Sequence, residues 1–90
     1  MTLRDLVAID QLSAFEMKEK QWLVDNMADQ LFEESMSEFS AFIATPTQEA
    51  TDRYVDDAIF YITSTDIVTF YNPYMIAPYT AGPIEVMIMR

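Results

Sequence analysis

"FYITSTDIVTFYNPYMIAPYTAGPIEVMI", residues 60–88, contains runs of β-branched and aromatic residues separated by a short polar bridge and a proline-rich bend. The runs Ile59–Thr63 and Ile67–Tyr71 flank the polar bridge, which is typical of an antiparallel hairpin. Ile84–Met89 reads as a further strand after the bend. The stretch therefore predicts a small antiparallel sheet made of a hairpin and a C-terminal strand.

The polar bridge also predicts which residues of the hairpin face each other. A tight turn at Thr65 and Asp66 would place aromatic residues opposite each other on both faces of the sheet. The expected pairs are Tyr61 with Phe70 and Phe60 with Tyr71. Both faces of the sheet are therefore expected to be at least partly covered.

The bend holds three of the four prolines and the only glycine of the chain. Pro73 and Pro78 fix φ and lack an N–H, so the backbone there cannot continue as an ordinary central strand. Gly82 can adopt a conformation that a side chain forbids, and Pro83 then directs the last strand back along the sheet. We expect the rigidity of this segment to be chiefly structural.

The first half of the chain has the pattern of helices. Thr2 with Asp5 and Ser13 with Glu16 have the capping-box form, which predicts a short helix over residues 3–8 and a long one from residue 14 into the thirties. Apolar residues recur at helical spacing: Phe15, Trp22, Leu23, Met27, Leu31, Phe32 and Met36. The acids expected mostly on the remaining, solvated surface are Glu16, Glu19, Asp25, Asp29, Glu33 and Glu34.

The helical pattern ends near the middle of the chain. Residues 37–43 either continue the long helix or begin another, and Pro46 stops the pattern. Thr47 is expected to cap one more turn through about Arg53, before the signal becomes strand-like near residues 54–58. Helices followed by strands indicate an α+β fold, with the long helix packed on the sheet as a single domain over residues 1–90.

Composition excludes several classes of function. The 90 residues contain no cysteine and no histidine, which removes disulfides, thiolate nucleophiles and the commonest general base. A net charge of −10 disfavours nucleic acid and favours a cationic partner. Mimicry of DNA is a weaker alternative, because thirteen of the fifteen acids lie in residues 1–57 and the last third is nearly uncharged. The sequence lacks a transmembrane segment or secretory signal, so any membrane attachment requires segments outside this chain.

No residues make a convincing catalytic, cofactor or metal site. The adjacent acids Glu33-Glu34 and Asp56-Asp57 are better explained as a solvated helix face and a strand-entry turn than as a hydrolytic pair. Trp22 is expected to be a core anchor, although a sugar platform stays open. The methionines are expected to fill the core, with Met87 and Met89 on one strand face.

The tyrosines give the only candidate contact residues. All five lie within residues 54–79, and those in the hairpin have aromatic neighbours to pack on. Tyr74 and Tyr79 instead flank the bend in a loop, where a flat ring with a hydroxyl suits recognition of a protein or a sugar. We therefore predict Tyr74 and Tyr79 as partner-binding residues.

Residues 60–88, with "TLRDLV" at residues 2–7, resemble the extracytoplasmic C-terminal domain of RsiV-type anti-sigma factors and PdaC-type peptidoglycan deacetylases. The shared features are the hairpin, the Pro-Tyr, the Ile-Ala-Pro-Tyr, a small residue before Gly, and the last strand. The resemblance differs at Thr65-Asp66, where that family usually has Asp-Gly. It covers nearly the whole chain, which would then be a fragment or a stand-alone copy of a larger module.

The resemblance implies a non-enzymatic domain of unknown function that acts outside the membrane of Gram-positive bacteria, in the cell envelope. It implies recognition of a lysozyme-like cationic protein or a cell-wall glycan as the function, without a cofactor. An accessory domain that positions a cell-wall deacetylase or hydrolase is the alternative. A structural homodimerisation module is a third possibility.

Overall fold

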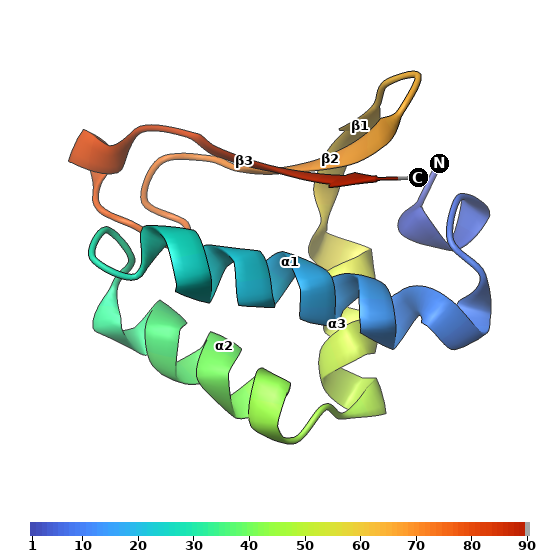
Figure 1. The fold of residues 1–90 in the computed structure, drawn as a ribbon, viewed down its shortest axis with the longest axis horizontal. Helices are drawn as coiled ribbons and strands as arrows, with labels where there is room; N and C mark the ends of the chain where they lie inside the picture. Colours follow the sequence, from blue (N-terminus) through green and yellow to red (C-terminus); the bar gives the residue numbers. More distant parts are fainter. Residues whose placement is uncertain (90) are drawn as a thin grey trace.

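Helices come first along the chain and strands come last, which confirms the α+β prediction (Figure 1). The computed structural model describes residues 1–89, so Arg90, the last residue of the predicted domain, lies outside the described residues. The helical elements are the 3₁₀ turns η1 (Leu3–Asp5), η2 (Ile9–Gln11) and η3 (Tyr79–Ala81) and the helices α1 (Leu12–Met27), α2 (Glu33–Ala44) and α3 (Gln48–Asp57). The strands are β1 (Ile59–Ile62), β2 (Asp66–Tyr71) and β3 (Ile84–Met89).

The three strands form an antiparallel sheet, as predicted, and their order is β1-β2-β3, but the hairpin register differs from the prediction by two residues. Tyr61 lies opposite Val68, and Phe60 lies opposite Thr69, so the expected pairs with Phe70 and Tyr71 are wrong. The reason is that the two-residue turn lies one residue earlier than expected, at Ser64 and Thr65, where the Thr63 N–H donates to the Asp66 carbonyl at 2.9 Å. A shift of two residues keeps every side chain on its expected face.

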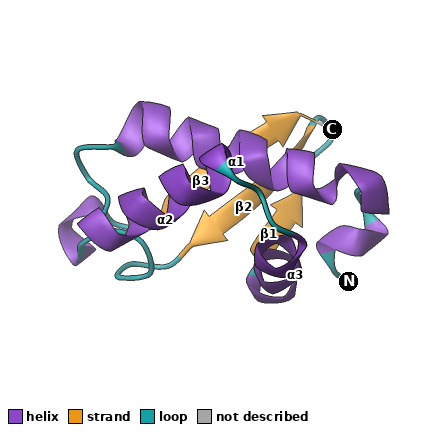
Figure 2. Cartoon of the chain, turned by 90° about the horizontal axis from the view of Figure 1, so that it is seen from below, coloured by secondary structure: helices purple, strands orange, loops and turns teal. Residues whose placement is uncertain are grey.

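Helix α1 is the central element of the molecule. One side of α1 packs against β3, and other sides contact α2 and α3 (Figures 1 and 2). Figure 1 shows α1 between the sheet and α2, while Figure 2 shows the helices in front of the sheet. Helix α1 is therefore covered on several sides, and its exposed residues are Ala14, Lys18, Gln21, Trp22, Asp25 and Asn26.

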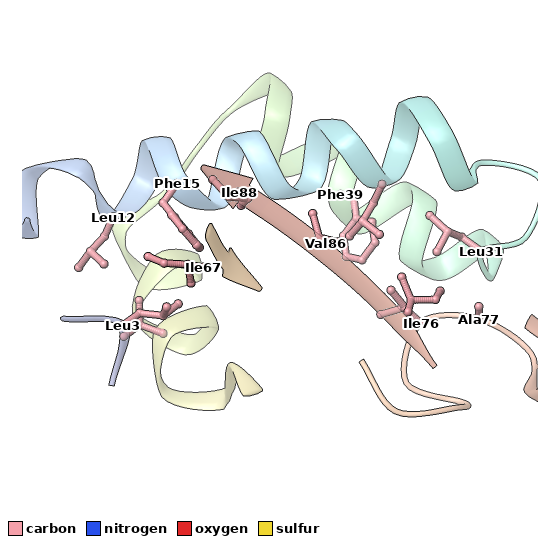
Figure 3. Packing of buried hydrophobic residues seen from close by; sticks show 13 residues of the cluster. Leu3, Leu12, Phe15, Leu31, Phe39, Ile67, Ile76, Ala77, Val86 and Ile88 are labelled. Atoms are coloured by element: carbon pink, nitrogen blue, oxygen red, sulfur yellow. The ribbon is translucent and has the colours of Figure 1, made fainter. Parts of the chain in front are cut away.

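The hydrophobic core lies between α1 and the inner face of the sheet (Figure 3). Leu23 of α1 and Val86 of β3 are fully buried. Strand β3 alternates buried and exposed residues, so Ile84, Val86 and Ile88 all face the helices. Ile76 and Ala77 bring the proline-rich bend into the same core.

The predicted long helix is wrong in length, since α1 ends at Met27 and α2 begins at Glu33. Between them the Leu31 side chain is buried, and the Phe32 N–H donates to the Ile76 carbonyl at 3.0 Å. The Phe32 N–H thus bonds to a segment far along the chain instead of to a carbonyl of the same helix. No glycine or proline lies near this point to indicate from the sequence that the helix ends. Phe32 and Trp22 are 36% and 38% exposed, so their assignment to the core face is also wrong.

The structure confirms some of the capping predictions and contradicts others. Thr2 and Asp5 form a capping box, but the element they open is the single 3₁₀ turn η1 and not a helix to residue 8. Thr47 caps α3 through the Ala50 N–H, as predicted, and α3 continues to Asp57. Ser13 caps nothing, because the preceding turn η2 leads directly into α1 and places Ser13 inside the helix.

The outer face of the sheet is partly covered, as expected, because Val68, which lies opposite Tyr61 and Met87, is only 1% exposed. Met87 and Met89 are 67% and 81% exposed, so the prediction that they fill the core is wrong. They point away from the helices because Val86 and Ile88 occupy the inner face of the same strand. Tyr61 lies on this outer face, and its hydroxyl donates to Glu85 at 3.2 Å.

Gly82 provides a test of the bend. Its φ of 71° and ψ of −169° lie in a region that is essentially restricted to glycine, and a Cβ at this position would meet no atom within 4 Å. Gly82→Ala should therefore lower the free energy of unfolding by about 1–3 kcal/mol through backbone strain alone, measured by urea denaturation. The exposed neighbour Thr80→Ala is the control and should change it by less than about 0.5 kcal/mol. Equal stability of Gly82→Ala and the wild type would contradict this explanation of the bend.

Candidate functional site

Three charged residues of α1 lie on one buried face of the helix. Glu16, Glu19 and Lys20 are three and four residues apart, so their side chains share a face. They are 1%, 0% and 8% exposed. The expectation that Glu16 and Glu19 lie on the solvated surface is therefore wrong. Its physical reason is the enclosure of α1, whose polar face meets the other helices and the sheet instead of water.

The Glu19 carboxylate joins three elements of the fold. Its Oε2 accepts a hydrogen bond from the Tyr54 hydroxyl of α3, and its Oε1 accepts one from the Tyr71 hydroxyl of β2. Burial raises the pKa of Glu19, while the neighbouring Lys20 charge and the tyrosine hydrogen bonds partly offset the rise. Burial and the Glu19 charge raise the pKa of both tyrosines well above the ordinary value, so both hydroxyls stay protonated as donors at neutral pH.

Lys20 is held by one carboxylate and a set of aromatic rings. Its Nζ lies 2.7 Å from Glu16 Oε2. The same Nζ lies 4.4 Å from the ring centroid of Tyr54, 5.3 Å from that of Phe39 and 5.6 Å from that of Phe42. These rings attract the ammonium through their negative faces. We call Glu16, Glu19, Lys20, Tyr54 and Tyr71 the buried polar cluster.

The buried polar cluster lines a pocket of about 720 Å³ among α1, α2, α3, β2 and the bend. Such a volume is in the range of small-molecule sites, about 300–1,000 Å³. Apolar side chains, among them Phe39, Phe42 and Ile76, make up much of the wall, and Glu38, Arg53 and Asp57 add charge. The pocket thus combines apolar walls with several convergent polar groups, which is the usual character of a binding site.

The predicted contact residues Tyr74 and Tyr79 come together in the bend. Their ring centroids are 5.5 Å apart, with ring planes inclined by 32°, and the side chains are 67% and 64% exposed. Tyr74 has a φ of 74°, an unusual conformation for a residue with a side chain. The bend therefore presents an exposed pair of aromatic rings to solvent.

The bend that carries these two residues lies at the end of the molecule where α1 turns into α2 (Figure 1). The hydrogen bond from Phe32 to Ile76 fastens the bend to this turn. Asp29, in the turn, and Glu33 and Glu34, at the start of α2, are exposed. We call Asp29, Phe32, Glu33, Glu34 and the bend residues 74–79 the loop end. Met75 also lines the pocket, so the loop end and the pocket adjoin.

The remaining sequence candidates behave as solvated side chains. Glu33 and Glu34 are exposed in the first turn of α2, as predicted. Asp56 and Asp57 are exposed in the last turn of α3 and not in a strand-entry turn, and Asp56 Oδ1 lies 3.2 Å from Arg4 Nη1. Within residues 1–89, no cluster of acidic side chains has the arrangement of a metal site, and no helix has the length and apolarity needed to span a membrane.

These observations define a small α+β domain with a pocket lined by the buried polar cluster and an adjoining loop that exposes two aromatic rings. The chain belongs to the family described as "Protein of unknown function (DUF3298)", whose model matches residues 6–90. Searches of curated proteins and of solved structures gave no match.

The role predicted for Tyr74 and Tyr79 from the sequence stays a prediction, and the sequence analysis missed the buried polar cluster. The acids of α1 follow the same helical spacing as solvated acids, so their spacing carried no signal. The available hint was the placement of Lys20 four residues after Glu16, which allows an ion pair on one helix face.

The raised pKa of Glu19 predicts a specific dependence of stability on pH. Because the folded state binds this proton more tightly, the contribution of Glu19 is fully present below its ordinary pKa of 4.5 and is lost as the pH rises through the folded pKa. Unfolding temperatures should therefore fall less steeply in Glu19→Gln than in the wild type as the pH rises above 4.5. The exposed Asp10→Asn is the control and should follow the wild type. Parallel curves for Glu19→Gln and the wild type would contradict the raised pKa.

The ion pair between Lys20 and Glu16 gives a second stability prediction. Lys20→Met removes the ammonium and leaves the Glu16 carboxylate buried without its partner, at a cost of about 3–5 kcal/mol in the free energy of unfolding. The double variant Glu16→Gln/Lys20→Met removes both charges and should recover much of that loss. Chemical denaturation of both variants measures the difference. A double variant less stable than Lys20→Met would show that the Glu16 charge is not the cause.

Proposed function

We propose that this domain is a non-catalytic recognition domain that binds a cationic protein outside the bacterial cell membrane, with a lysozyme-like protein as the leading partner. The observation that carries the proposal is the exposed Tyr74–Tyr79 ring pair at the loop end. Large rings that are solvent-exposed in a free domain are typical anchors of protein interfaces, where tyrosine is enriched.

Charge supports a cationic partner. The chain carries a net charge of −10, and exposed acids accompany the ring pair at the loop end. Complementary charge increases the rate of association and disfavours acidic competitors. A basic protein surface would therefore be drawn to the same region in which the aromatic rings can make close contact.

The resemblance to the extracytoplasmic domain of RsiV-type anti-sigma factors supports the location and the partner class. In that resemblance the domain acts in the cell envelope, and its best-understood member senses lysozyme by binding it directly. The alternative role, as an accessory domain of a cell-wall deacetylase or hydrolase, leads to binding of peptidoglycan in place of a cationic protein. The two roles therefore differ in the ligand that the isolated domain recognises.

Calorimetric titration with hen lysozyme and with peptidoglycan fragments tests the proposal. Lysozyme should bind, and binding should weaken as salt screens the charges. Tyr74→Ala and Tyr79→Ala should each weaken it by about tenfold or more, as expected of interface anchors, with unchanged unfolding temperatures.

Tyr61→Ala is the matched control, because Tyr61 is a 46% exposed tyrosine on the outer face of the sheet. This variant should bind lysozyme as the wild type does. Binding of peptidoglycan alone would favour the accessory role. Equal lysozyme binding by the wild type and by Tyr74→Ala/Tyr79→Ala would overturn the assignment of the loop end.

A further inference from the structure

We infer that the pocket of the buried polar cluster receives a guanidinium or ammonium group, presented as an arginine or lysine side chain of the partner protein. This inference rests on the proposed function and extends it, since it adds a second contact beside the loop end.

One of the residues that line the pocket has an unpaired hydrogen-bond acceptor. Glu16 is 1% exposed, and its Oε2 is paired with Lys20 at 2.7 Å. Its Oε1 is buried and has no hydrogen-bond partner among residues 1–89. A buried acceptor of this kind is costly when it stays unpaired, and a ligand that donates a hydrogen bond to it gains the corresponding energy.

The charged residues of the lining determine whether the pocket favours a cation or an anion. Among the described residues, the acids that line it are Glu16, Glu19, Glu38 and Asp57, and the bases are Lys20 and Arg53. Lys20 is already paired with Glu16, and both oxygens of Glu19 accept tyrosine hydroxyls, as an ionised carboxylate can. The acids are in excess, so the pocket favours a cation and disfavours an anion.

Aromatic rings form one wall of the pocket around the Lys20 ammonium. Phe39, Phe42 and Tyr54 already lie within 5.6 Å of the Lys20 ammonium, measured to their ring centroids, so these rings tolerate a positive charge nearby. A guanidinium is planar and weakly hydrated, and it stacks on aromatic faces while it donates to carboxylates. Arginine therefore fits the combination of walls and acceptors especially well.

The position of the pocket explains how one partner could use both contacts. Met75 lines the pocket, and it directly follows Tyr74 of the exposed ring pair. A partner that packs on the rings therefore lies beside the pocket and can extend a long basic side chain into it. The pocket volume of about 720 Å³ leaves room for such a side chain.

The direct test uses N-acetyl-arginine amide as the probe and N-acetyl-citrulline amide as its uncharged isostere, followed by amide chemical shifts of the labelled 90-residue chain. The arginine probe should shift resonances of pocket residues such as Phe39 and Phe42 in a saturable way, and the citrulline probe should shift them much less. Equal responses to both probes, or no response to arginine, would overturn the inference.

Variants at the edge of the pocket avoid disturbing the buried ion pair. Glu38→Gln/Asp57→Asn removes two exposed acids of the lining and should weaken arginine binding about fivefold, the combined effect of two partly screened contacts. Asp10→Asn/Asp25→Asn is the matched control, because it removes the same charge from exposed positions outside the lining. Equal weakening by both double variants would reduce the effect to net charge and overturn the assignment of the pocket.

The same variants separate this inference from the proposed function. Saturable arginine binding in the pocket without lysozyme binding would support the pocket and overturn the lysozyme partner. Lysozyme binding that depends on Tyr74 and Tyr79 but not on Glu38 and Asp57, with no response to the arginine probe, would support the proposed function and overturn the pocket.

Discussion

The structure depends on the burial of Glu19 at the meeting point of α1, α3 and β2. Two tyrosine hydroxyls, from Tyr54 of α3 and Tyr71 of β2, donate hydrogen bonds to this carboxylate. A buried carboxylate without such donors would be strongly unfavourable, so the two tyrosines have to hold their positions. The cluster therefore fixes how the helices meet the sheet, and it also forms part of the lining of the pocket.

The sequence predicted the order of elements better than their contacts. The β-branched runs located the strands, and Thr47 located the start of α3, because both signals act within a few residues. The end of α1 at Met27 was not predictable, since it depends on the hydrogen bond from Phe32 to the distant Ile76. Glu16 and Glu19 were misplaced because an amphipathic pattern assumes that one face of a helix meets water, and α1 is covered on several sides.

The candidate site likewise has one part that could be predicted from the sequence and one part that could not. Tyr74 and Tyr79 were predictable from their position in a proline-rich loop, where a ring has no strand neighbour to pack on. The pocket was not predictable, because its lining comes from three helices, two strands and the bend, which only the fold brings together. The loop end and the pocket adjoin through Met75. The residues predicted from the sequence and the pocket found in the structure therefore form one continuous surface.

A double-mutant cycle on Tyr54→Phe and Tyr71→Phe tests the central role of Glu19 most directly. Each variant removes one hydroxyl and keeps the ring, and each should lower the free energy of unfolding by about 1.5–3 kcal/mol, as for hydrogen bonds to a charged group. Because both hydroxyls serve one carboxylate, the double variant should depart from additivity by at least about 0.5 kcal/mol. Small and additive losses would contradict a shared buried carboxylate as the organising contact of this fold.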